Sequence, residues 1–521
     1  MRQKKLILHF RNYLPVLLLG FLSFFVNYHY GFIGVMPMDN FVLYNGGYKI
    51  LNGYIPFTDY WLVTGPLLDY LNALIFYING VSWNSYIIHS SLFNLIISIA
   101  TYILFTDLGL NKKFSFIYSL FYSLLFYPVV GTPFVDHHST FFLILSFYFF
   151  IFAINKNRYK YLISVPFLFC LSFLSKQTPA AYGLLIISPL ITVFLFHNKN
   201  HIFLKLIFLT LGTIISILFL ISFFYLTNIN INNFYEQYIL YAKTLGDFRF
   251  SNYEFDLINL FLKFKFITIL IGFLIIILLK TFRKKNSTSS SLIIITSISL
   301  SCLLIFHQFY TLNQNYIFFL IPFMTGVGHI FYEKVFKKNF FLIFMILLCT
   351  FATAKYHLRF NEHRKFNELE KVDLSKAINA EILSQDLKGL KWITYKYPNN
   401  PEVEIANLLK VMEILKNDNS KKSLITEYQF LASALKIHDF SPNQWHHPSV
   451  SFPTSKQKYF TKYKYFFIQN LKRNNIDVIY ETSRTEKSTV EMIIDKDCFF
   501  KERKTEMMVK FVIKKDCNDF R

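Results

Sequence analysis

Residues 203–226, FLKLIFLTLGTIISILFLISFFYL, decide the fold class, because these 24 consecutive residues carry only one charged side chain, Lys205. A helix of about 20 apolar residues spans the hydrocarbon core of a bilayer. Similar runs recur as far as about Ala354 and then stop. We interpret eleven of them as spans, near residues 14–34, 86–106, 114–131, 138–154, 159–175, 180–197, 203–226, 257–280, 291–310, 315–333 and 340–354. The sequence therefore predicts a mainly α, polytopic membrane helical bundle over residues 1–355.

The composition agrees with this class. The 521 residues are 53% hydrophobic and include 63 Phe, which is more apolar surface than a soluble core of this size needs. The 54 Lys and Arg exceed the 32 Asp and Glu and give a net charge of +22. Because the basic residues lie mostly between apolar runs and in the tail, they are typical of the flanks of membrane spans. The pattern argues against an ordinary soluble enzyme, and no nucleic-acid partner is expected.

The distribution of Lys and Arg predicts the orientation. In the eleven-span arrangement, eighteen basic residues flank the side of the N-terminus and six flank the other side. Cytoplasmic loops are enriched in Lys and Arg, so we expect the N-terminus inside and, with an odd number of spans, the tail outside. Residues 66–80, PLLDYLNALIFYING, are short for a span and carry Asp69, so we expect a helix lying at the outer interface.

The tail, residues 356–521, is predicted to be a small extracytoplasmic α/β domain. Strand-like runs at residues 391–397, 423–428 and 476–480 alternate with helix-like runs at 402–415 and 458–473. Cys498 and Cys517 are the two cysteines that could pair, if the tail faces an oxidising compartment. For the adjacent His446 and His447, an ordinary turn is expected in preference to a metal site.

The first outer loop, residues 36–83, is the most informative stretch: MPMDNFVLYNGGYKILNGYIPFTDYWLVTGPLLDYLNALIFYINGVSW. Residues 40–51 are expected to form a short amphipathic helix with Asp39 as its cap, and Asp59 is interpreted either as a turn residue or as a site residue. The sequence contains no GxxxxGK[ST], GxGxxG, HExxH or CxxC motif. ATP hydrolysis, dinucleotide chemistry and the common zinc motifs therefore have no support.

Taken together, the motifs of this loop resemble those of the GT-C membrane glycosyltransferases. The resemblance is carried by Asp39 after the first span, then Gly-Gly-Tyr, Gly-Tyr-Ile-Pro-Phe-Thr-Asp, Gly-Pro-Leu-Leu and Gly-Val-Ser, and it is best over residues 36–179. Within the superfamily it is similar to the branch of protein O-mannosyltransferases, aminoarabinose transferases and RgtA/B/C/D-like enzymes. The acidic pair usual in this loop is Asp39-Asn40 here, so the second carboxylate is absent.

The resemblance implies a polyprenyl phosphate sugar donor and transfer with inversion to a lipid, glycan or protein acceptor outside the cytoplasm. It places Asp39 at the position of the catalytic carboxylate, which would accept the proton of the acceptor hydroxyl. Together with the high Lys, Asn, Ile and Phe usage, it indicates a bacterial inner-membrane protein surrounded by membrane lipids.

Further candidate residues lie on the predicted outer side. In the loop Gly131 to His138, Asp136 with His137 or His138 has ligand types that suit a divalent cation, or Asp136 caps the next span. Lys176 and Gln177, at the end of the fifth span, are candidates for the donor phosphate, and a snorkelling lysine is the alternative. Asp59, Tyr60, His307, Gln308, Tyr310, Asn315 and Tyr316 are candidates for sugar or headgroup contacts. No cofactor is required by the sequence.

Three other classes of membrane protein compete with this interpretation. A flippase or transporter of lipid-linked glycans predicts a polar path through the bundle and often an internal repeat, and the sequence has neither. An O-antigen ligase-like or polymerase-like enzyme usually relies on a large outer loop late in the bundle, whereas here the most patterned loop comes first. A structural or receptor protein that acts through its tail is the third.

Overall fold

The computed structural model describes residues 2–197, 201–251, 256–284, 288–311, 316–336, 339–482, 488–517 and 519–520. The chain forms two compact units, each built from three separate segments. Unit 1 contains residues 1–31, 87–221 and 252–366, and unit 2 contains residues 32–86, 222–251 and 367–521. Compared with the predicted division at residue 355, unit 2 includes the first loop and residues 222–251 in addition to the tail.

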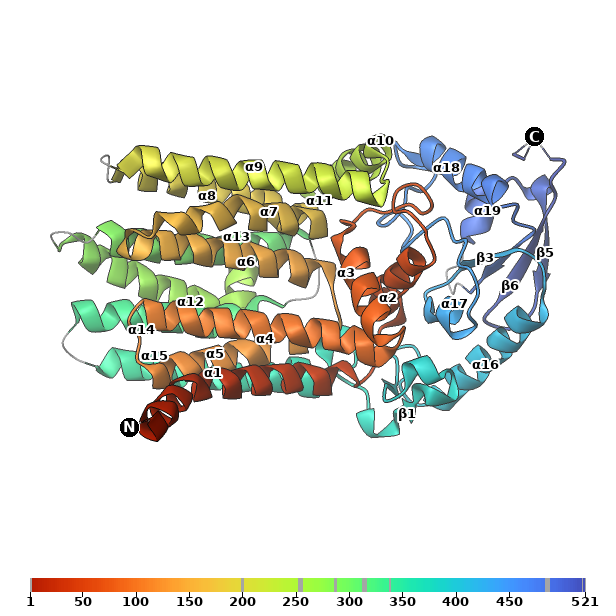
Figure 1. Cartoon of the computed structure of the whole chain (residues 1–521). Coiled ribbons are helices and arrows are strands. Elements are labelled where there is room, and N and C mark those ends of the chain that lie inside the picture. Colours follow the sequence, from red (N-terminus) through yellow and green to blue (C-terminus); the bar gives the residue numbers. More distant parts are fainter. Residues whose placement is uncertain are drawn as a thin grey trace. The chain divides into compact units, whose positions relative to one another are not determined.

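The helices that lie wholly or mostly in unit 1 account for all eleven predicted spans (Figure 1). They are α1 (Arg2–Gly31), α4 (Trp83–Asp107), α5 (Lys112–Leu125), α6 (Val135–Ile154), α7 (Ser164–Ser175), α8 (Gln177–His197), α9 (Ile202–Thr227), α12 (Leu257–Phe282), α13 (Thr288–Thr311), α14 (Leu320–Val335) and α15 (Phe340–His357). The mainly helical membrane class is confirmed.

Eight of these helices are long and apolar enough to cross a membrane, counted over the described residues: α1, α4, α6, α8, α9, α12, α13 and α15. The other three are shorter than the roughly 20 residues that a span needs. α5 has 14 residues, α7 has 12 and α14 has 16, and each adjoins a 3₁₀ turn that lengthens it. The number of eleven spans and the orientation stay predictions.

Polar side chains and small residues join the helices of unit 1. The Ser139 hydroxyl of α6 lies 3.0 Å from the Ser172 hydroxyl of α7, and a Cβ at Gly183 of α8 would lie 2.3 Å from Leu143 of α6. Close approach through small residues and hydrogen bonds between helices are typical of membrane bundles. Lipid tails are as apolar as protein side chains, so moving a helix from lipid into contact with another helix brings no hydrophobic gain. These contacts hold α6, α7 and α8 together, and α13 packs against α6 and α8.

Unit 2 combines short helices with two small sheets. Its elements are α2 (Pro37–Leu51), α3 (Leu67–Asn79), α10 (Ile231–Phe234), the π-helix η5 (Tyr235–Tyr241), α11 (Ala242–Ser251), β1 (Ile378–Asn379), β2 (Lys391–Trp392), α16 (Pro401–Asn417), β3 (Lys422–Ile425), α17 (Phe430–Ala434), α18 (Phe460–Arg473), β4 (Val478–Glu481), α19 (Thr489–Ile493), β5 (Phe499–Arg503) and β6 (Val509–Ile513). The α/β character of the tail is confirmed, while β5 and β6 were not predicted from the sequence.

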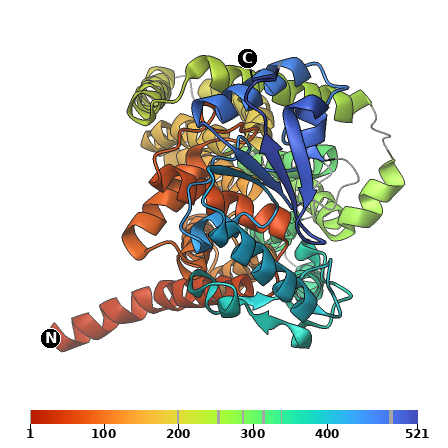
Figure 2. The same cartoon turned by 90° about the vertical axis from the view of Figure 1, so that its right-hand side faces the viewer.

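The larger sheet, whose strands are the blue arrows in Figure 2, has the strand order β3-β4-β6-β5, with β3 and β4 parallel and the other pairs antiparallel. α18 buries Tyr463, Phe467 and Leu471, which recur every four residues and form one apolar helix face. This face joins a buried cluster that contains Ile479 of β4 and also Trp61 of the first loop. The first loop is therefore part of the core of unit 2.

The glycine pair of the first loop allows α2 and α3 to pack closely. A Cβ at Gly46 would lie 2.2 Å from the Asp69 carboxylate, and a Cβ at Gly47 would lie 2.8 Å from Asn72. Such distances are far below van der Waals contact, so a larger residue would push the two helices apart. The Gly-Gly motif is thereby explained by packing.

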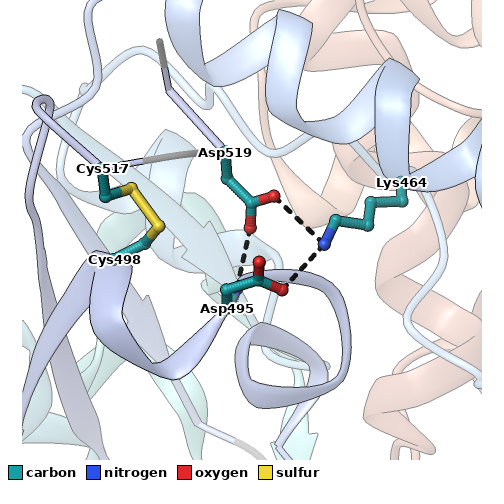
Figure 3. The surroundings of a disulfide bond; sticks show 5 residues. All are labelled: Lys464, Asp495, Cys498, Cys517 and Asp519. Atoms are coloured by element: carbon teal, nitrogen blue, oxygen red, sulfur yellow. Dashed lines mark hydrogen bonds and ion pairs between the residues drawn. A yellow bond between two sulfur atoms is a disulfide. The ribbon is translucent and has the colours of Figure 1, made fainter.

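A disulfide joins Cys498, just before β5, to Cys517, after β6. Beside it, the Lys464 ammonium lies 2.9 Å from Asp495 and 3.1 Å from Asp519 (Figure 3). The bond and the ion pairs fasten the end of the chain to α18. The structure thus contains the Cys498–Cys517 disulfide, which the sequence alone did not decide.

Candidate active site

A buried group of charges in unit 1 brings together the predicted residues Asp136 and Lys176. Asp136 lies in the first turn of α6 with its side chain 1% exposed. The Lys176 ammonium is 2.7 Å from both carboxylate oxygens, and His307 Nε2 is 3.1 Å from one of them. An ionised carboxylate is costly at membrane depth, and partners of this kind offset the cost.

Asp136 does not cap α6, so the capping alternative is wrong. The residue at the cap position is Phe134, which makes no side-chain cap hydrogen bond, and the Asp136 carboxylate binds Lys176 and His307 instead.

The backbone between α7 and α8 positions Lys176. α7 ends at Ser175 and α8 begins at Gln177, while Lys176 itself is extended, with φ −159° and ψ 142°. The helical path is broken at this residue, and its side chain reaches Asp136 of α6. The Lys176 side chain is 16% exposed, against 1% for Asp136, so Lys176 is the more accessible member of the pair.

The described residues of the predicted polar turn near residue 307 make contacts within unit 1. Gln308 is buried and its side-chain oxygen accepts a hydrogen bond from the Tyr316 backbone at 2.9 Å. The buried Tyr316 hydroxyl lies 3.0 Å from Thr140 of α6. Tyr310 is half-buried and its ring stacks on Phe306. Asn315 lies outside the described residues.

The two histidines beside Asp136 point to different neighbours. His138 hydrogen-bonds Tyr127 and lies 3.0 Å from His89, a buried residue that the sequence did not single out. The His137 ring packs on Tyr316 with 4.3 Å between ring centroids. Among the described residues, no three His, Cys, Asp or Glu side chains gather as a metal site would require. Asp136, His137 and His138 therefore do not fit a divalent cation as a set.

Arg364 supports the turn that precedes Asp136. Its fully buried guanidinium donates to the backbone oxygens of Pro128 and Val130, both at 2.8 Å. No motif marked this arginine, because it lies beyond the last apolar run and reaches the turn only through the fold.

In unit 2, Asp39 lies in the first turn of α2 and is half-buried. The helix begins at Pro37, three residues earlier than expected, and its cap residue is Met36, so the prediction that Asp39 is the cap is wrong. The neighbouring Asn40 reaches back instead, and its side-chain oxygen accepts from the Met36 backbone N–H at 2.7 Å. The positive end of the helix dipole favours a carboxylate at Asp39.

Asp59 and Tyr60 take structural positions in unit 2. Asp59 accepts from the Ile55 backbone at 2.6 Å, as its turn interpretation expected, and its other oxygen pairs with Arg473 at 2.6 Å. The buried Tyr60 hydroxyl donates to Asp69 at 2.9 Å. Burial raises the pKa of Asp69 to about 7.

The model of the dolichyl-phosphate-mannose-protein mannosyltransferase family matches residues 63–225. This family belongs to the GT-C-like membrane glycosyltransferases, so the predicted resemblance is confirmed, and with the apolar helices it supports an integral membrane glycosyltransferase. The match includes Asp136, Lys176 and Gln177, whereas Asp39 and His307 lie outside it. A comparison with curated proteins found no match.

Proposed function

We propose that this chain transfers a sugar from a polyprenyl phosphate donor to a lipid, glycan or protein acceptor outside the cytoplasm, with inversion at the anomeric carbon. The observation that carries the proposal is the Lys176 ammonium, held at a helix break by a buried carboxylate within the segment that matches the family.

Lys176 is suited to hold the donor phosphate. An ammonium has three N–H donors, and the Asp136 oxygens take two of them. The third can donate to a phosphate oxygen, and the charge on that oxygen grows as the phosphate departs. Asp136 and His307 fix the position of the ammonium, and Gln177, at the start of α8, is a further candidate for this phosphate.

Asp39 is suited to act as the base. The acceptor oxygen attacks the anomeric carbon from the face opposite the phosphate, and a new C–O bond forms. The bond between the anomeric carbon and the phosphate oxygen breaks, and its electron pair leaves with the phosphate. Asp39 accepts the acceptor's proton, and its negative charge also stabilises the positive charge that develops on the sugar ring.

Two observations support an extracytoplasmic site. The Lys and Arg count predicts that residues 32–86 and the tail lie outside. The Cys498–Cys517 disulfide fits this side, because such bonds persist in oxidising compartments. For a bacterial cell this corresponds to the outer face of the inner membrane.

The test compares mass spectra of envelope glycans from cells that carry the native chain, its deletion, Asp39→Asn or Lys176→Met. We expect the deletion and Asp39→Asn to lack the same sugar, and transfer by Lys176→Met to fall by roughly 100-fold. The exposed residues Asp247 and Lys243 provide the matched controls Asp247→Asn and Lys243→Met.

A second variant separates catalysis from folding. Lys176→Met leaves the buried Asp136 without its main partner, whereas the double variant with Asp136→Asn removes both charges and restores stability. We expect the double variant to reach normal protein levels and still to lack transfer. Normal glycans in Asp39→Asn at equal protein level would refute the assignment of the base.

A further inference from the structure

Unit 2 contains a cavity of about 680 Å³ between the first loop, the segment α10–η5 and α18. This volume lies within the range of small-molecule sites in proteins. None of the residues proposed for the donor phosphate or for the base lines it.

The deep wall of the cavity is held rigid by hydrogen bonds to the first loop. The Gln237 side chain accepts from the Leu62 backbone N–H at 3.0 Å and donates to the Phe57 oxygen at 2.9 Å. Asn470 of α18 donates to the Asp59 backbone oxygen. Both amides are fixed by the fold, so the wall is formed before any ligand arrives, which lowers the entropic cost of binding.

Aromatic rings line the same cavity at two depths. Trp61 is only 3% exposed and packs edge-on against Phe466, with 5.6 Å between ring centroids. Tyr465, one residue earlier on α18, is 67% exposed at the cavity. An exposed aromatic ring beside polar groups offers an apolar face and a hydroxyl to one ligand. A pyranose has the matching surfaces, a face of C–H groups and an edge of hydroxyls.

The charged residues at the cavity are already paired. Arg473 pairs with Asp59 at 2.6 Å, and Lys462 pairs with Glu236. The two cations and two anions sum to zero, so the cavity has no net positive charge that would attract a phosphate or carboxylate ligand. This balance favours a neutral ligand over a phosphorylated one.

We infer that the cavity binds a neutral saccharide and thereby selects a glycan, free or as the sugar part of a glycolipid, as the acceptor of the transfer reaction. This inference rests on the proposed function. Tyr465 packs against the C–H face of a sugar ring, and the exposed Gln469 side chain bonds its hydroxyls.

Direct binding to the full-length protein in lipid nanodiscs tests this inference without relying on catalysis. The probes are neutral mono- to tetrasaccharides of glucose, galactose, mannose and N-acetylglucosamine, with the corresponding sugar 1-phosphates as a second arm. Binding is measured by saturation-transfer NMR and calorimetry. We expect at least one neutral oligosaccharide to bind, and Tyr465→Ala and Gln469→Ala to weaken it by roughly tenfold each.

The control Phe500→Ala removes an aromatic ring of similar exposure, 63%, on strand β5 outside the cavity, and should leave the affinity unchanged. The inference is overturned if no neutral saccharide binds, if Tyr465→Ala binds equally well, or if only the sugar 1-phosphates bind. Asp39→Asn should bind the saccharide as the native protein does. Full transfer by Asp39→Asn would count against the proposed base and leave the binding result standing.

Discussion

Replacing Asp69 with Asn should change how the stability of the protein depends on pH. Asp69 is fully buried and accepts hydrogen bonds from the Tyr60 hydroxyl at 2.9 Å and from the Gln444 amide at 2.6 Å. Burial nevertheless raises its pKa from 3.8 to about 7. The protonated form of the folded state therefore contributes stability in full below about pH 4, and this contribution is lost as the pH rises to about 7.

The size of the effect follows from the two pKa values. The pKa of Asp69 is 3.8 in the unfolded chain and about 7 in the folded one. This difference lowers the free energy of unfolding by about 2.5 kcal/mol between pH 5 and pH 8. The amide side chain of the Asp69→Asn variant does not titrate and resembles the protonated acid. The Gln444 side-chain oxygen has no partner among the described residues, so this amide can turn over and accept from the new side chain.

The assay is thermal unfolding in detergent, followed by tryptophan fluorescence at pH 5, 6, 7 and 8. We expect the Tm of Asp69→Asn relative to the native protein to rise by a few degrees between pH 5 and pH 8. Asp497→Asn, which changes an exposed carboxylate of the same unit, should show no such trend. A Tm difference that is the same at all four pH values would refute the reasoning.

Two further changes probe the packing of the fold. Gly46→Ala should destabilise the protein by about 1–3 kcal/mol, because the new Cβ would lie 2.2 Å from Asp69. The control is Gly272→Ala, whose Cβ meets nothing within 4 Å and which should not destabilise the protein. Equal melting temperatures of the two variants in a thermal scan would contradict this prediction. Replacing both Cys498 and Cys517 with Ala should lower the free energy of unfolding by about 3 kcal/mol, because the disulfide closes a loop with a sequence separation of 19 residues. Dithiothreitol should lower the Tm of the native protein and leave the Tm of the variant unchanged. If dithiothreitol affected both proteins equally, the result would count against the disulfide.

The membrane helices could be predicted closely because apolar length alone determines them. The span predicted at residues 203–226 is the helix Ile202–Thr227, and the span predicted at residues 291–310 is the helix Thr288–Thr311. Helices shortened by 3₁₀ turns, such as Lys112–Leu125, were predicted too long, since turns buried in protein are as apolar as the helix they continue.

Single site residues could be recognised, but their pairing could not. Asp136 and Lys176 stood out because charges beside apolar runs are rare. Their contact spans 40 residues of sequence and depends on how α6, α7 and α8 pack, which no local pattern encodes. The contact of His307 with Asp136 could not be predicted for the same reason, and the expected contact of His307 with sugar or a headgroup stays a prediction.

The sequence also did not show which segments of the chain combine to form unit 2. The loss of apolar runs after residue 355 marks a true change in composition. It does not reveal that Asn45 of the first loop donates to Asp439 of the tail at 2.6 Å. Contacts at such sequence separation become visible only in the folded chain.

The shared core of the first loop and the tail has a consequence for biosynthesis. Asp59 and Asn470, which share a hydrogen bond, are 411 residues apart, so at about 5–20 residues per second the loop leaves the ribosome roughly 20–80 s before its partner exists. During that delay the aromatic side chain of Trp61 lacks its contacts with Tyr463 and Phe466 of α18, and chaperones or proteases have time to engage it. A message cut short before α18 would therefore yield a product that cellular quality control can recognise by its first loop.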